Sequence, residues 1–150
     1  MLSFEIKSPE TDEEFDRYFH LRWLLLRAPW GEPEGSEVDD IEPDCFHLMA
    51  HCGEDVIAVA RLQFNAPNEA QIRYMAVTPA CQRRGVGRQI IQRLEHETAS
   101  HAIDSIVLDA RDNAVPFYRA LGYHVTGKSY LLFDEIQHYR MQKKLTGLHE

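Results

Sequence analysis

The sequence is poor in the features that mark a secreted or membrane-bound protein. Its three cysteines, Cys45, Cys52 and Cys81, are odd in number and show no Cys-x-x-Cys spacing, a pattern that favours reduced thiols over a disulfide framework. No apolar run approaches the roughly 20 residues that a membrane span needs. The first residues also lack the basic and apolar regions of a secretory signal. We therefore expect a cytoplasmic protein with no membrane partner.

An overall excess of basic residues is also missing. Lys and Arg number 16 against 24 Asp and Glu, which gives a formal net charge of −8. Nucleic-acid-binding domains usually present a basic face, so we expect no nucleic-acid partner. A hydrophobic content of 44% over 150 residues is ordinary for a globular protein. Because no linker, repeat or low-complexity tract divides the chain, we predict one domain over residues 1–150.

A zinc site is not expected either. Cys45, His47, His51 and Cys52 lie close together in the sequence, but strand alternation would place Cys52 on the face opposite to the other three. No further group of Cys or His completes a set of four ligands. We therefore predict that the chain holds no metal.

Residues 82–88 have the composition of a phosphate-binding turn. Gly85 and Gly87 lie between a strand-like run that ends near Pro79 and an amphipathic helix. Glycine lets the backbone turn tightly and approach a ligand closely, so that N–H groups at the helix start can point at one anion. Three arginines add positive charge where the helix dipole already favours negative groups. They are Arg83, Arg84 and Arg88.

Two well-known phosphate loops do not match this segment. It lacks the Gly-Lys-Ser/Thr end of a Walker loop, and Ile90 stands where the dinucleotide fingerprint needs its third glycine. As Gln-x-x-Gly-x-Gly, the segment instead resembles the acetyl-coenzyme A pyrophosphate loop of the GNAT N-acetyltransferase superfamily. Residues 108–123 resemble the second signature of that superfamily, in which an Asn opens a short helix that carries Phe-Tyr and Leu-Gly-aromatic closes it. The two signatures in family order are more specific than either alone.

The hydrophobic pattern predicts the element order that this resemblance implies. A strand at 4–6 precedes a helix from 12 to about 27, whose start has capping-box spacing at Thr11 and Glu14. Further strands are expected at 45–51, 55–64, 70–77, 103–108, 125–133 and 136–145, with helices from about 85 and over 113–121. We predict an α/β fold with a mixed, mostly antiparallel central sheet of about seven strands and flanking helices, the GNAT-like acyl-CoA N-acyltransferase fold.

The resemblance also implies where the cosubstrate acetyl-CoA binds. Backbone groups of residues 75–77 would meet the pantetheine arm and the thioester, and the amides of residues 83–88 would hold the pyrophosphate. Asn113 would meet the amide-bearing arm, although Asn also caps helices well, and Phe117 would pack against the coenzyme unless it is only a core aromatic. The implied coenzyme-binding residues are Met75, Ala76, Val77, Gln82, Arg83, Arg84, Gly85, Val86, Gly87, Arg88, Asn113 and Phe117.

The implied reaction is transfer of the acetyl group to a primary amine by direct attack in a ternary complex. A free aliphatic amine has a pKa of about 10 and must lose a proton before it attacks the thioester. The departing thiolate benefits from an acid, and Tyr118 matches the tyrosine of the family. On a helix that begins at Asn113, Tyr118 would point inward. We expect the Val77 N–H to donate to the oxyanion.

The general base and the acceptor stay open at this point. No spacing selects among the groups that could face the amine. They are Glu37, Asp39, Asp40, Glu69, Asp109, His47 and His138. The acidic stretch 32–44 contains no base; it either attracts a cationic acceptor, such as a polyamine, an aminoglycoside or a lysine-bearing peptide, or forms a solvated loop.

A second class of function is a non-catalytic acyl-CoA-binding sensor or regulatory module. The missing base supports this alternative, whereas Tyr118 favours the enzyme. The partner expected for the enzyme is a small-molecule or peptide amine. The resemblance also implies a homodimer, for which the closing hairpin at 125–145 offers an edge for pairing.

Overall fold

The structure is a computed structural model that describes residues 2–145. These residues form two compact units, one of residues 2–63 with 74–94 and the other of residues 64–73 with 95–145. Each unit is described by itself below. The expectation of a single domain over residues 1–150 stays a prediction.

The strands form a seven-stranded sheet in the order β1-β2-β3-β4-β5-β7-β6. Strands β4 and β5 pair in parallel, whereas β1 with β2, β2 with β3, β5 with β7, and β6 with β7 are antiparallel pairs. The predicted mixed, mostly antiparallel sheet is therefore confirmed. The strands are β1 (Glu5–Lys7), β2 (Phe46–Cys52), β3 (Asp55–Ala66), β4 (Glu69–Val77), β5 (Ser105–Arg111), β6 (His124–Leu132) and β7 (Ile136–Lys144).

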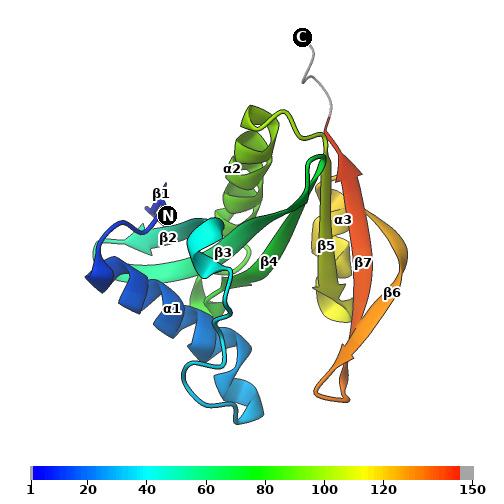
Figure 1. Ribbon diagram of the computed structural model, residues 1–150. Coiled ribbons are helices and arrows are strands. Elements are labelled where there is room, and N and C mark those ends of the chain that lie inside the picture. Colours follow the sequence, from blue (N-terminus) through cyan, green and yellow to red (C-terminus); the bar gives the residue numbers. More distant parts are fainter. Residues whose placement is uncertain (1, 146–150) are drawn as a thin grey trace. The chain divides into compact units, whose positions relative to one another are not determined.

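Helix α1 (Asp12–Leu26) begins at the capping box that its spacing predicted. The Thr11 hydroxyl accepts the Glu14 N–H at 3.1 Å, and the Glu14 carboxylate accepts the Thr11 N–H at 3.3 Å. Each group satisfies a donor that the helix itself leaves unpaired. Farther along, Tyr18 and Leu21 are buried against β2 and β3, so α1 covers one face of these strands (Figure 1).

Glu14 also carries the first testable charge effect. Lys7 Nζ lies 2.7 Å from Glu14 Oε2. Hydrogen bonding from Lys7, followed by backbone N–H groups, lowers the pKa of Glu14 from 4.5 to about 2. A carboxyl with a lowered pKa in the folded state contributes stability that is present above its unfolded pKa and is lost as the pH falls through its folded pKa.

We expect Glu14→Gln to melt at a lower temperature than the wild type near neutral pH, because the ion pair with Lys7 is lost. The amide still serves the capping box, so the substitution isolates the charge. The difference between the two melting temperatures should shrink as the pH falls from 4.5 to about 2. Thermal melts followed by circular dichroism measure this, and a difference that does not vary with pH would contradict it.

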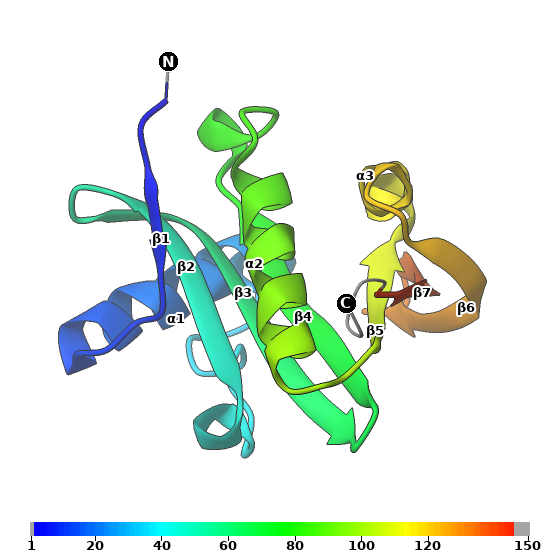
Figure 2. The same ribbon diagram turned by 90° about the horizontal axis from the view of Figure 1, so that it is seen from above.

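Helix α2 (Val86–Ser100) follows the predicted apolar pattern. Val86, Ile90, Ile91 and Leu94 are all fully buried or nearly so, because their spacing puts them on one side of the helix. In the first unit, α1 and the beginning of α2 lie on opposite faces of β2 and β3 (Figure 2). The predicted start of α2 near Gly85 is confirmed.

In the second unit, helix α3 (Val115–Ala120) is shorter than predicted. The expected start was Asn113, but residues Asp112–Ala114 form a separate 3-10 turn and Ala114 is the N-cap, without a side-chain cap. Pro116 explains the difference: proline has no N–H and fits only the first helical turn, so the helix begins just before it. The prediction that Asn113 opens or caps this helix was therefore wrong.

Strand β5 also runs differently from its predicted range of 103–108. It begins at Ser105 and continues to Arg111, which pairs with His138 of β7. The apolar run ended at Leu108, but pairing with β7 holds the polar residues beyond it in the strand.

Among residues 2–145, no helix is both long and apolar enough to cross a membrane.

Candidate functional site

The predicted phosphate loop leads from the end of β4 to the start of α2. Arg83 and Gly85 have left-handed backbone angles, with φ of 62° and 87°. The first intrahelical bond of α2 runs from the Gln89 N–H to the Gly85 carbonyl at 3.1 Å. The N–H groups of residues 86–88 therefore lie in the first turn of α2, ahead of the first intrahelical bond, where N–H groups have no intrahelical acceptor. This arrangement can bind an anion.

The two glycines of the loop have different roles. Gly85 supplies the left-handed turn, whereas Gly87 lies inside the first turn of α2. Gly87 therefore does not make the turn, and its close approach to a ligand stays a prediction. Arg83 adopts a left-handed conformation that costs a non-glycine residue about 1–2 kcal/mol, and such residues cluster at functional sites. The side chains of Arg83, Arg84 and Arg88 are exposed.

Gln82 ties this loop to the end of β4. Its side-chain amide donates to the Val77 carbonyl at 3.1 Å, and its backbone N–H donates to the Pro79 carbonyl at 3.3 Å. The Thr78 N–H in turn donates to Ile57 of β3 at 2.9 Å. The predicted pantetheine segment, residues 75–77, and the phosphate loop are thus held together in the first unit. Gln82, predicted to bind the coenzyme, positions the loop in this structure.

A strained residue, Tyr74, lies directly before the pantetheine segment. Its φ of 54° is left-handed, which is rare for a bulky residue. Three guanidinium groups surround its ring: the carbon atoms of Arg22, Arg61 and Arg27 lie 4.3, 4.8 and 5.6 Å from the ring centroid. No sequence motif indicated this arrangement.

Two of these arginines belong to an arginine–carboxylate cluster of Arg22, Arg61, Asp39 and Glu42, of which all but Asp39 are buried. Both arginine side chains are fully buried. Arg22 Nη1 lies 2.6 Å from Glu42 Oε2, and Arg61 contacts Asp39 through two bonds of 2.8 and 2.9 Å as well as Glu42 at 2.9 Å. The acidic stretch 32–44 is therefore not simply a solvated or cation-attracting loop, because two of its carboxylates balance buried arginines.

Two further base candidates of the first unit are engaged in internal contacts. His47 Nδ1 lies 2.9 Å from the Tyr18 hydroxyl, and its Nε2 lies 2.8 Å from the Glu42 carbonyl. Burial lowers the pKa of His47, which favours the neutral ring. The buried Glu37 carboxylate accepts the Gly35 N–H at 2.8 Å. His47 cannot take a proton from a substrate without breaking one of its two bonds, and Glu37 is buried.

The second unit holds Tyr118, the predicted acid. The side chain is 7% exposed, and its ring meets those of Phe117 and Tyr123 edge-on at 5.0 and 5.9 Å. Burial raises the pKa of Tyr118, so its hydroxyl stays protonated at neutral pH and can donate. No hydrogen bond from this hydroxyl is found within residues 2–145. Phe117 and Asn113 are exposed, so Phe117 is not a core aromatic.

The remaining base candidates are also in the second unit. Asp109 Oδ1 lies 3.0 Å from Arg140 Nε, and the Glu69 carboxylate accepts the Asn65 amide at 2.9 Å. His138 Nδ1 lies 3.0 Å from the Ile136 carbonyl. Burial lowers the pKa of His138. The structure thus brings residues 75–77 and 82–88 together in one unit, and Asn113, Phe117 and Tyr118 together in the other.

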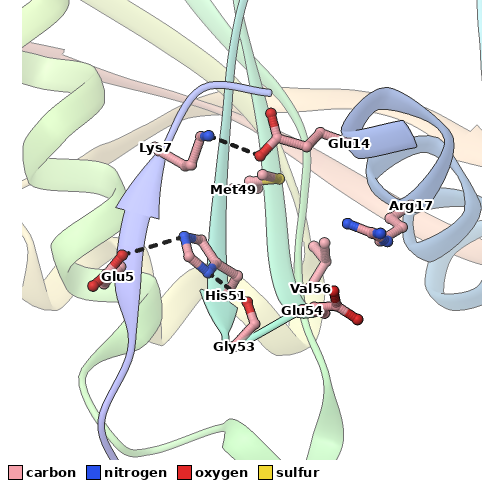
Figure 3. Close-up of a pocket in the computed structure, with 9 residues that line it drawn as sticks. All are labelled: Glu5, Lys7, Glu14, Arg17, Met49, His51, Gly53, Glu54 and Val56. Carbon is pink, nitrogen blue, oxygen red and sulfur yellow. Dashed lines mark hydrogen bonds and ion pairs between the residues drawn. The ribbon is translucent and has the colours of Figure 1, made fainter. Parts of the chain in front are cut away.

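A pocket of about 290 Å³ lies in the first unit (Figure 3). Lys7 and Glu14 face each other across it, and His51 Nε2 lies 3.6 Å from the exposed Glu5 carboxylate. The lining residues are Glu5, Lys7, Glu14, Arg17, Met49, His51, Gly53, Glu54 and Val56. No predicted site residue lines it. In the described part of the chain, no group of three or more His, Cys, Asp or Glu side chains could hold a metal ion.

Known proteins resemble this chain over nearly its full length. A family model described as the acetyltransferase (GNAT) domain matches residues 36–145. The uncharacterized N-acetyltransferase YjcF of Bacillus subtilis strain 168 is 25% identical over 134 residues, which cover 89% of this chain and 95% of YjcF.

Two solved structures share the fold. An acyl-CoA N-acyltransferase from Pseudomonas aeruginosa is 23% identical with a TM-score of 0.79, and the match covers 95% of this chain and 99% of that one. A Bacillus subtilis acetyltransferase solved in complex with CoA is 17% identical with a TM-score of 0.77, over 95% of this chain and 99% of that one. The seven-stranded sheet with flanking helices is the architecture that these structures share with this chain.

Proposed function

This chain belongs to the GNAT acetyltransferase family and is an acetyl-CoA-dependent acetyltransferase, and from that membership we infer that it transfers the acetyl group to a primary amine by direct attack in a ternary complex. The observation that carries this proposal is the loop at the start of α2. Left-handed angles at Arg83 and Gly85 precede three N–H groups that lie ahead of the helical ladder. Such a helix start binds phosphate groups well.

In this proposal, residues 83–88 bind the pyrophosphate of acetyl-CoA. The N–H groups of residues 86–88 donate to its oxygens, and the exposed arginine side chains add charge-assisted contacts. Residues 75–77 meet the pantetheine arm and the thioester, and the Val77 N–H donates to the oxyanion that forms on attack. The bond from Gln82 to the Val77 carbonyl supports this, because it couples the end of β4 to the loop.

Tyr118 is the proposed acid, which donates its proton to the departing thiolate. Burial raises the pKa of Tyr118, so the phenol is fully protonated and ready to donate; the raised pKa also lowers the driving force for proton transfer to a thiolate. Phe117 offers an exposed ring for packing against the coenzyme, and Asn113 offers an exposed amide. Both assignments derive from the family signature.

The amine must lose a proton before attack, and the contacts described above narrow the groups that could accept it. Asp39 and Asp109 hold arginines, and Glu37 and His47 are buried in internal hydrogen bonds. Asp40, Glu69 and the second ring nitrogen of His138 remain, acting directly or through water.

The proposed acceptor is a small-molecule or peptide amine. Besides Asp39, which contacts Arg61, the stretch 32–44 has three exposed acids that would attract such a cation; they are Glu34, Asp40 and Asp44. We also propose a cytoplasmic location, which three free thiols support, and a homodimer that pairs through the β6–β7 hairpin.

Two measurements test the proposal together. Titration calorimetry measures binding of coenzyme A. A thiol-release assay measures how fast free coenzyme A forms from acetyl-CoA when a polyamine, an aminoglycoside or a lysine-bearing peptide is supplied as the acceptor. We expect binding, and release that depends on one of these amines. Binding without release on any amine would favour the acyl-CoA sensor, and no binding at all would overturn both functions.

Gly85→Ala tests the loop itself. A Cβ at Gly85 meets no atom within 4 Å, so the substitution adds left-handed strain of about 1–2 kcal/mol without a clash. We expect the affinity for coenzyme A to fall about tenfold. The strain is relieved when the loop amides move away from the positions that bind the pyrophosphate, and about 1.4 kcal/mol corresponds to a factor of ten. Gly31→Ala is the matched control, since Gly31 is also left-handed, at φ 74°, with open space around it. An equal affinity loss in both variants would show that the loop has no special role.

A further inference from the structure

Contacts of the Tyr74 side chain hold this residue in its left-handed conformation. In a strand, a residue with φ of 54° interrupts the regular ladder and changes the direction of the backbone that follows. The residues that follow are 75–77. Since such a conformation persists only when its surroundings fix it, the contacts of the Tyr74 ring decide where this backbone points.

The ring is fixed by the two buried arginines. The guanidinium carbons of Arg22 and Arg61 lie 4.3 and 4.8 Å from its centroid, within cation–π range. Both side chains are fully buried, and within residues 2–145 the Nε atom of each has no hydrogen-bond partner. The aromatic face of Tyr74 is therefore a major partner of both cations, and the ring has little freedom to move.

The arginines are in turn fixed from several elements. Arg22, on α1, donates to the Glu37 carbonyl at 3.1 Å and to the Tyr18 hydroxyl at 3.1 Å besides its ion pair with Glu42. Arg61, on β3, donates to Gln63 at 2.6 Å besides its bonds to Asp39 and Glu42. Helix α1, strand β3 and the segment 37–42 thus converge on one tyrosine ring.

We propose that Arg22 and Arg61 are positioning residues for acetyl transfer, which act by clamping Tyr74 and so aiming the backbone groups of residues 75–77 at the thioester. The inference rests on the proposed function, because it takes residues 75–77 to meet the thioester. It adds residues that no GNAT signature in the sequence contains. Neither arginine touches the acetyl group; each acts through the tyrosine.

Tyr74→Leu removes the ring and keeps a side chain of moderate size. We expect kcat for thiol release to fall about 10- to 100-fold, the range that follows when reacting groups are misplaced by about 1 Å. Affinity for coenzyme A should fall less than kcat does, because the helix-start amides of the pyrophosphate loop keep their positions in α2. Tyr74→Phe keeps the ring and should restore kcat to within about twofold of the wild type. Thiol release is measured with whichever acceptor, an amine of the panel or water, gives the highest rate.

Arg61→Lys tests the clamp from the other side. Lysine keeps the charge but cannot form the two-point contact with Asp39 or lie flat on the ring, so kcat should fall about tenfold. The double variant with Tyr74→Leu should be no slower than Tyr74→Leu alone, because both changes break the same unit. Fully additive effects would contradict the clamp.

Phe19→Leu is the matched control. Its ring centroid lies 4.9 Å from the Arg22 guanidinium carbon, so the substitution also removes an aromatic partner of a buried arginine, but Phe19 is remote in sequence from residues 75–77. We expect a lower melting temperature with unchanged kcat. If folded Tyr74→Leu keeps the wild-type kcat, the positioning role is wrong. If the wild type itself neither binds coenzyme A nor releases thiol, the proposed function fails instead.

Discussion

Tyr118→Phe is expected to lower kcat for acetyl transfer by about 100-fold, the lower end of what a positioned proton donor contributes. The phenol is buried and its pKa is raised, so in the wild type the proton is present when the thiolate departs. Phenylalanine fills nearly the same volume, and the edge-on contacts with Phe117 and Tyr123 can persist. The effect should therefore appear in kcat and not in the affinity for coenzyme A, which stays within about threefold.

Tyr123→Phe is the control for this substitution. Tyr123 is also buried, lies 5.9 Å from the Tyr118 ring, and donates its hydroxyl to Glu95 at 2.8 Å. Removing that hydroxyl should cost stability of about 1–3 kcal/mol, because the bond to a carboxylate is lost, while kcat is unchanged. Thiol release at saturating acetyl-CoA and amine measures both variants. Equal kcat values for Tyr118→Phe and the wild type would make Tyr118 a core aromatic and nothing more.

Elements with a strong local pattern could be predicted from the sequence. The capping box at Thr11 and Glu14 formed as its spacing indicated, and the apolar side of α2 is buried. These features depend on residues three or four positions apart, so the sequence shows them directly. The start of α3 is also encoded locally, because Pro116 marks the first helical turn.

The arginine–carboxylate cluster could not be predicted from local patterns. Its contacts join residues 20 and 22 positions apart, in Arg22 with Glu42 and Arg61 with Asp39, and no periodicity encodes such a pairing. One signal was nevertheless present. Arg61 lies in the apolar run of β3, and an arginine is almost never fully buried unless it is paired. A search for carboxylates able to pair with it would have pointed to the acidic stretch 32–44.

The left-handed conformation of Tyr74 has no such signal. An aromatic residue in a strand-like run predicts an extended backbone, whereas Tyr74 has a φ of 54° among surrounding arginines. The sequence therefore indicated the anion loop, whose chemistry lies in adjacent residues. It did not reveal the arginine contacts of the Tyr74 ring, because these come from α1 and β3, which are far from Tyr74 or from each other in the sequence.

Arg22→Met is expected to lower the free energy of unfolding by about 3–5 kcal/mol, the usual cost of removing one partner of a buried ion pair. Arg22 is fully buried and the Glu42 side chain is 10% exposed, so water screens the pair little. Without Arg22, Glu42 loses the cation nearest to it, and Arg61 still contacts both Asp39 and Glu42. Urea denaturation measures the change; a domain of this kind has only about 5–15 kcal/mol in total, so the unfolding midpoint should fall steeply.

A second substitution separates the excess charge from the lost packing. Glu42→Gln in the Arg22→Met background removes the carboxylate that has lost its nearest cation, and the amide oxygen can still accept from Arg61. The double variant should regain about 1–3 kcal/mol, because replacing both partners of a buried pair costs much less than leaving one unpaired. If the double variant is no more stable than Arg22→Met, the loss arises from packing of the guanidinium on Tyr18, Phe19 and Tyr74. In that case the carboxylates serve to orient the arginines, and the aromatic contacts supply the stability.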